Sequence, residues 1–123
     1  MPGHIVGWML DKEDRAALLR AFPPAYGRVV ADHVTLQAGL RSRPTLPPAT
    51  EAEVVGMADD GAGVQALVVE IGGTTDRPDG STYHLTWSLA EGRKPVESNQ
   101  VIRRHGWKPV ERHRIRLSPQ QFR

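Results

Sequence analysis

Apolar runs of strand length, each bounded by turn-forming residues, constrain the fold of this chain more than any other sequence feature. The runs predict β-strands over residues 5–10, 29–37, 53–57, 64–71, 82–89 and 112–117. Asp59-Asp60-Gly61 predicts the turn of a hairpin between the third and fourth of these strands. Two stretches rich in glycine and proline, 39–49 and 72–81, predict loops.

Two segments carry helical signals. Asp11 is a predicted N-cap for a first helix, which Pro23-Pro24 ends. Pro95 suits the first turn of a second helix over 96–105, which Gly106 ends. The resulting order is β-α-β, ββ, β-α-β. It predicts an α+β fold in which antiparallel strands are flanked by two helices and the two β-α-β halves are roughly symmetrical.

The chain length of 123 residues fits one compact domain over 1–123. The chain contains no cysteine, which excludes disulfides and thiolate metal sites and suits a reducing compartment. Its first ten residues lack the basic flank and apolar run of a signal peptide, and no segment has membrane-spanning length. We therefore expect a cytoplasmic monomer that does not bind membranes.

The formal net charge of +2 hides an uneven distribution of charged side chains. Residues 1–90 carry 7 basic and 11 acidic side chains, whereas residues 91–123 carry 9 basic and 3 acidic ones. A basic face of this kind would raise the local concentration of a phosphate-bearing ligand. Solvated, arginine-rich surfaces of a strand and a helix explain the same charges, and charge alone favours that interpretation.

Two His-x-Thr motifs, His33-Val34-Thr35 and His84-Leu85-Thr86, lie on predicted strands in opposite halves of the chain. Successive side chains of a strand point to opposite faces, so the imidazole and the hydroxyl of each motif emerge on the same face. The intervening Val34 and Leu85 are predicted to point into the core. Two such strands side by side would present two imidazoles and two hydroxyls around one small cavity. A lone histidine in a strand is more often structural, but two copies of the motif favour a functional site.

Such a cavity suits in-line cleavage of a phosphodiester without a metal ion or another cofactor. One neutral histidine would take a proton from the attacking water, and the other, protonated, would give a proton to the leaving sugar oxygen. The hydroxyls of Thr35 and Thr86 would bind the non-bridging oxygens. Imidazole suits both roles because its ordinary pKa, about 6.5, leaves both protonation states available near neutral pH. The sequence does not assign which of His33 and His84 is the acid.

The two motifs and their surroundings also resemble the two-histidine (2H) phosphoesterase superfamily, which has paired His-x-Thr/Ser motifs on two strands. Ala31–Leu36 and Tyr83–Gly92, followed by Glu97-Ser98-Asn99, look like the cyclic phosphodiesterase domain of plant and fungal tRNA ligases. The opening strand and the helix with Arg15–Leu19 before Phe22-Pro23-Pro24 are similar to related small 2H proteins. The resemblance covers most of the chain, although only the two motifs are diagnostic.

The resemblance implies a 2H phosphoesterase-like fold and hydrolysis of a 2′,3′-cyclic phosphate, usually to a 2′-phosphate, with His33 and His84 as the acid and base. The substrate would be a nucleoside 2′,3′-cyclic phosphate or a cyclic RNA end, with ADP-ribose cyclic phosphate and cyclic oligonucleotides as further candidates. The short chain favours a small ligand, whereas the basic residues 91–123 keep an RNA end among the candidates. A different function also stays open, namely an RNA-end or nucleotide-binding module without significant turnover.

Six further residues are candidates for substrate binding. They lie in the turn before the first motif, in the loop after it, or near the start of the second helix: Tyr26, Arg41, Arg43, Lys94, Ser98 and Asn99. Tyr26 would stack on a base, and a helix N-terminus would help to bind phosphate. Helix capping and solvation explain the last three residues equally well.

The other histidines, His4, His105 and His113, have no Ser or Thr two positions further on, and we interpret them as surface or structural residues. Trp87 lies on the strand face opposite the motif and is predicted to pack in the core. No histidine pair or nearby carboxylate has metal-ligand spacing, and threonine is a poor ligand. The sequence therefore predicts no metal site.

Overall fold

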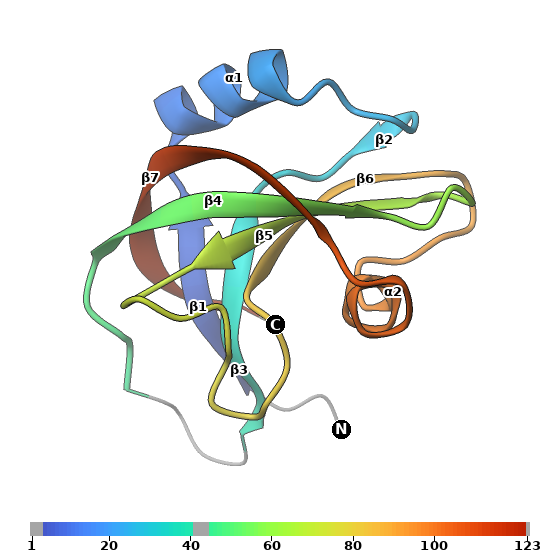
Figure 1. Ribbon diagram of the computed structural model, residues 1–123. Helices are drawn as coiled ribbons and strands as arrows, with labels where there is room; N and C mark the ends of the chain where they lie inside the picture. Colours follow the sequence, from blue (N-terminus) through green and yellow to red (C-terminus); the bar gives the residue numbers. More distant parts are fainter. Residues whose placement is uncertain (1–3, 41–44, 123) are drawn as a thin grey trace.

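Strands of a single antiparallel sheet make up most of the protein (Figure 1). The computed structural model describes residues 4–40 and 45–122. Their elements in chain order are β1 (His4–Leu10), α1 (Lys12–Ala21), β2 (Arg28–Val29), β3 (His33–Leu40), β4 (Thr50–Asp59), β5 (Val64–Glu70), β6 (His84–Leu89), α2 (Glu97–His105) and β7 (Lys108–Phe122). The strand order β6-β3-β1-β7-β4-β5 closes into a six-stranded barrel because β5 also pairs with β6. The short β2 adds to the edge of β6.

This barrel corrects the predicted α+β fold: the flanked sheet with two symmetrical β-α-β halves is wrong. The error comes mainly from β7, which was predicted only over 112–117 but extends over Lys108–Phe122 and pairs with both β1 and β4. About half of its side chains are exposed, nearly all of these are polar, and only Ile115 and Leu117 are buried in it. Its apolar alternation is therefore too short to reveal a strand that joins two others.

The structure agrees better with the predicted helix ends and turns than with the predicted arrangement of the strands. The Asp11 carboxylate caps α1 by accepting the backbone N–H groups of Glu13 and Asp14, at 3.1 and 3.0 Å. Gly106 ends α2 with a left-handed φ of 70°. The predicted hairpin between β4 and β5 is confirmed as an antiparallel pair. In the described residues, neither helix is long and apolar enough to cross a membrane.

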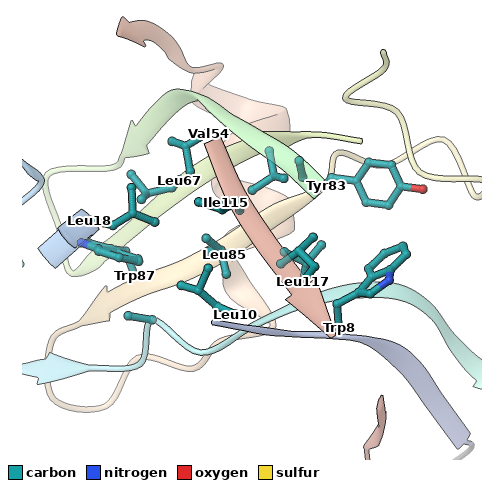
Figure 2. Packing of buried hydrophobic residues seen from close by; sticks show 14 residues of the cluster. Trp8, Leu10, Leu18, Val54, Leu67, Tyr83, Leu85, Trp87, Ile115 and Leu117 are labelled. Carbon is teal, nitrogen blue, oxygen red and sulfur yellow. The ribbon is translucent and has the colours of Figure 1, made fainter. Parts of the chain in front are cut away.

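The interior of the barrel is filled with large apolar side chains, as expected for a barrel of this size (Figure 2). All six barrel strands contribute to this cluster, which includes Trp8, Leu10, Val34, Val54, Leu67, Val69, Leu85, Trp87, Ile115 and Leu117. Helix α1 lies over one end of the barrel, where its Leu18 packs near Trp87 (Figures 1 and 2). The predicted core position of Trp87 is confirmed.

A second apolar cluster lies outside the barrel wall, under α2. Val101 and Ile102 of α2 pack against Val55 of β4 and Ala66 and Val68 of β5. The neighbours of these strand residues, such as Val54 and Leu67, belong to the interior cluster, so the two clusters occupy opposite faces of the same wall. Helix α2 is therefore fixed on the outer surface of the barrel.

Gly7 permits the close approach of β1 and β3. It pairs with Thr35, and a Cβ at position 7 would lie only 2.1 Å from the Val34 carbonyl oxygen. Gly7→Ala must therefore push β3 away, and we expect the free energy of unfolding to fall by about 1–3 kcal/mol, measured by urea denaturation. Gly27→Ala is the matched control, since nothing lies within 4 Å of a Cβ there. Equal stability of the two variants would contradict the close packing of β1 on β3.

Candidate functional site

The two His-x-Thr motifs lie on neighbouring antiparallel strands, β3 and β6, which pair through Val34 and Leu85. On the other side of this pair the Ala31 N–H donates to the Thr86 carbonyl oxygen at 2.9 Å, so the register shifts between Ala31 and Val34 and His33 lies in the irregular part of the strand. Both histidines nevertheless line the same cavity.

All four motif side chains line a single cavity of about 230 Å³: His33, Thr35, His84 and Thr86. Val34 and Leu85 between them are completely buried in the barrel interior, so the cavity lies on the outer face of the wall. Ile5 and Ala38 form part of its lining on the barrel side, and Pro95, Val96 and Asn99 line it from the start of α2. The positive end of the helix dipole therefore borders the cavity.

A carboxylate and an aromatic ring orient His33. Asp32 Oδ1 lies 2.6 Å from His33 Nδ1, so this nitrogen carries the hydrogen and Nε2 is left for a ligand. The ring of Phe122, at the end of β7, lies with its centroid 4.8 Å from that of His33. Ala31 just before this pair has a left-handed φ of 48°, which is strained for alanine. Its carbonyl accepts the Arg15 Nε–H at 2.8 Å, which helps to hold the bend that sets Asp32 beside the imidazole.

His84 is oriented by the backbone instead. Its Nδ1 donates to the carbonyl oxygen of Thr82 at 2.8 Å, which again leaves Nε2 for a ligand. Burial lowers the pKa of His84 below its usual value, and the Thr82 carbonyl opposes this shift. The positive charges of Arg77 and of the other motif histidine lower the pKa further. His84 is therefore the histidine that the site keeps neutral.

The two threonines differ in their hydrogen bonds. Thr35 makes no side-chain hydrogen bond to any described residue, so its hydroxyl proton is available in the cavity. Thr86 Oγ1 lies 2.9 Å from Ser98 Oγ and 3.3 Å from the Pro95 carbonyl oxygen. When the completely buried Ser98 donates to Thr86, the Thr86 proton can turn from the Pro95 carbonyl to a ligand oxygen. Ser98 is therefore a positioning residue for Thr86.

A buried cation that no sequence pattern predicts, Arg77, also lines the cavity. Its side chain is only 5% exposed. Within residues 4–40 and 45–122 its one side-chain hydrogen bond runs from Nη2 to Asp79 Oδ2, at 3.3 Å, and its Nε has no partner. A buried guanidinium is costly unless its donors and its charge are paired. Arg77 is therefore suited to receive an anion in the cavity, and phosphate matches its donor geometry.

The loop before β6 holds Arg77 in place. The Arg77 N–H donates to the Ser81 carbonyl at 2.8 Å, and the Gly80 N–H donates back to the Arg77 carbonyl at 2.9 Å. Asp79 accepts both the backbone N–H and the hydroxyl of Ser81, which, together with the Arg77 charge, lowers the pKa of the Asp79 carboxyl. No sequence pattern marks Arg77, because its burial depends on how this turn-rich loop packs.

The further candidates for substrate binding have different places in the structure. Asn99 lines the cavity, whereas the exposed Lys94 does not. Tyr26 also lies outside the cavity lining, and its hydroxyl donates to Asp59 Oδ1 at 2.6 Å. The Asp59 carboxylate raises the pKa of Tyr26 by accepting this bond. Arg41 and Arg43 lie outside the described residues.

The remaining histidines lie elsewhere. His4 is hydrogen-bonded to Gln121, His113 packs edge-on against Phe22, and His105 is exposed at the end of α2. Among the described residues, no three His, Cys, Asp or Glu side chains are grouped so that they could hold a metal ion.

Comparisons of the chain with protein family models, with curated proteins and with solved structures find no match.

Proposed function

We propose that this protein hydrolyses a nucleoside or RNA 2′,3′-cyclic phosphate to a 2′-phosphate, with His84 as the general base and His33 as the general acid. The observation that carries this proposal is the single cavity in which two oriented imidazoles, two hydroxyls and a buried guanidinium meet. These are the groups that in-line cleavage of a phosphodiester needs without a metal ion.

The different environments of the two histidines support the assignment of their roles. His84 is kept neutral, with its Nδ1 hydrogen bonded to the Thr82 carbonyl, so its Nε2 lone pair can take a proton. His33 donates its Nδ1–H to the Asp32 carboxylate, which orients the ring and leaves Nε2 facing the cavity. Its Nε2–H can then give a proton to a leaving group. One site thus holds a base and an acid that differ in their surroundings.

In the proposed reaction, a water oxygen attacks phosphorus while His84 Nε2 removes a proton from that water. The bond from phosphorus to O3′ breaks, and His33 Nε2 transfers its proton to O3′. The product is a 2′-phosphate monoester with a free 3′-hydroxyl. Arg77 and the hydroxyls of Thr35 and Thr86 stabilise the negative charge on the non-bridging oxygens.

The resemblance of the motifs to those of 2H phosphoesterases supports the same reaction, although the fold is not the one that this resemblance implied. The cavity of about 230 Å³ suits a phosphate with its ribose better than a long RNA segment. We propose that the chain acts as a monomer in the cytoplasm, since the absence of cysteine suits a reducing compartment.

The test is hydrolysis of the four nucleoside 2′,3′-cyclic phosphates in the presence of EDTA, with the product isomer identified by chromatography. We expect turnover that EDTA does not reduce and a 2′-phosphate product. If the protein bound these cyclic phosphates but hydrolysed neither them nor a cyclic RNA end, it would be a binding module. That result would reject the proposed catalysis.

The pH dependence gives a separate prediction. We expect kcat/KM to be bell-shaped, because His84 must be neutral while His33 is protonated. The acidic limb reports protonation of His84. Since burial and the Arg77 charge lower the pKa of His84, activity should persist below pH 6.5, the usual value for histidine, before it falls. A profile whose acidic limb begins above that value would contradict the assignment of His84 as the base.

A further inference from the structure

We propose that a depression beside the two-histidine cavity is the subsite for the nucleoside that carries the cyclic phosphate. Trp107 would stack on its base, and Arg103 would bind its 5′-phosphate. This inference rests on the proposed function and narrows its substrate. The protein would select a 5′-phosphorylated nucleotide, as found at the 3′ end of an RNA, over cyclic phosphodiesters that lack a base.

The depression adjoins the catalytic cavity directly. It has a volume of about 220 Å³ and lies between the loop before β6, with Ser81 and Thr82, and the second half of α2. Asn99 lines both the cavity and the depression. The Thr82 carbonyl accepts the Nδ1–H of His84, so the depression begins directly behind the proposed base. A ligand whose phosphate lies between the histidines can therefore extend into it.

Trp107 forms the far side of the depression and is 36% exposed, whereas Trp8 and Trp87 are 4% and 0% exposed. Its ring rests on Gly56 of β4, where an added Cβ would lie 2.0 Å from the ring atom Cε3. The indole is thus held against the barrel wall while part of it stays accessible. A fixed, accessible indole suits stacking with a nucleobase.

Arg103 supplies the charge of the depression. It stands four residues after Asn99 on α2, on the same helix face and about 6 Å further along the axis. Arg103 is exposed and has no ion pair with any described residue, and none of the described residues that line the depression is acidic. A second anion is therefore favoured one helical turn beyond the cyclic phosphate, on the other side of the ribose.

Binding of the product-like monoesters tests this subsite without turnover. Dissociation constants of inorganic phosphate, adenosine 2′-phosphate and adenosine 2′,5′-bisphosphate would be measured by calorimetry at constant ionic strength. We expect the wild-type protein to bind adenosine 2′-phosphate at least about 10-fold more tightly than phosphate, because base stacking adds to the affinity. The bisphosphate should bind more tightly still.

Three substitutions separate the contributions. Trp107→Ala should weaken adenosine 2′-phosphate about 10- to 100-fold and leave inorganic phosphate unchanged. Trp107→Leu keeps an apolar side chain over Gly56 and should show the same loss of affinity for adenosine 2′-phosphate. It serves as the second test in case Trp107→Ala folds poorly. Arg103→Ala should weaken the bisphosphate about 3- to 5-fold but not the monophosphate. Arg104→Ala, which removes the next exposed arginine outside the depression, is the control and should change neither.

The outcomes also separate this inference from the proposed reaction. Hydrolysis together with equal affinities for phosphate and adenosine 2′-phosphate would overturn the subsite and leave the two-histidine mechanism in place. The predicted affinities without hydrolysis would support the subsite and reject the catalysis. Unchanged adenosine 2′-phosphate binding in folded Trp107→Ala and Trp107→Leu would also overturn the subsite.

Discussion

His84→Ala is expected to lower kcat for a nucleoside 2′,3′-cyclic phosphate about 10²- to 10⁴-fold, with little change in stability. The variant removes the imidazole that burial keeps neutral and whose Nε2 is available to take a proton from water, and no other described residue of the cavity takes over this role. Steady-state kinetics with urea denaturation as a folding control would measure both effects. His105→Ala, which removes an exposed histidine outside the site, should keep wild-type turnover.

His33→Ala is expected to lower kcat by a similar factor, because it removes the proposed general acid and not the base. A change of leaving group distinguishes the roles of the two histidines. A phosphodiester with p-nitrophenolate as the leaving group needs no proton from a general acid. Such a substrate should restore much of the rate of His33→Ala and none of the rate of His84→Ala. The reverse pattern would exchange the acid and the base, and equal recovery in both variants would contradict separate roles for the two histidines.

The position of these histidines on one face of the sheet could be predicted, because it depends on the alternation of side chains along each strand, which is a local pattern. Alternation along a strand places His33 and Thr35 on the face opposite Val34, whatever the rest of the fold does. The presence of two copies of the motif favours neighbouring motif strands, and the Val34–Leu85 pair supports this expectation. A pattern of only three residues was sufficient because the site uses one face of two strands.

The barrel could not be predicted in this way, because its closure depends on pairings between distant parts of the chain. β7 pairs with β1 and β4, and β5 pairs with β6, but no local signal specifies these partners. Reading β7 as a short strand and the two helices as sheet covers led to the wrong α+β fold. In the structure, α1 lies over one end of the barrel and α2 packs on its outer wall.

The place of Arg77 in the site could not be predicted either, because it also depends on how distant parts of the chain pack. As a sequence position it is one arginine in a loop of glycine, proline and aspartate, and such arginines are usually solvated. Its burial arises only when that loop folds beside the cavity. By contrast, the basic residues of 91–123 include Arg112 and Arg116, which pair with carboxylates on the protein surface.

Arg77→Met is expected to lower kcat/KM about 10²- to 10³-fold, because it removes the buried positive charge that lines the cavity and would stabilise the phosphate oxygens in the proposed reaction. It should also move the acidic limb of the pH profile to higher pH, since the Arg77 charge lowers the pKa of His84. Arg77→Lys should recover only part of the activity, because an ammonium group lacks the planar donor pair.

Stability measurements separate this role from a structural one. Arg77 has an unpartnered Nε, and its carboxylate partner, Asp79, is more than half exposed and is held by Ser81 as well. Replacing the guanidinium with an apolar side chain should therefore leave the free energy of unfolding unchanged or increase it. If Arg77 served mainly to hold its loop, Arg77→Met would unfold more easily and keep its activity. Loss of activity without loss of stability identifies a buried charge that is kept for the ligand.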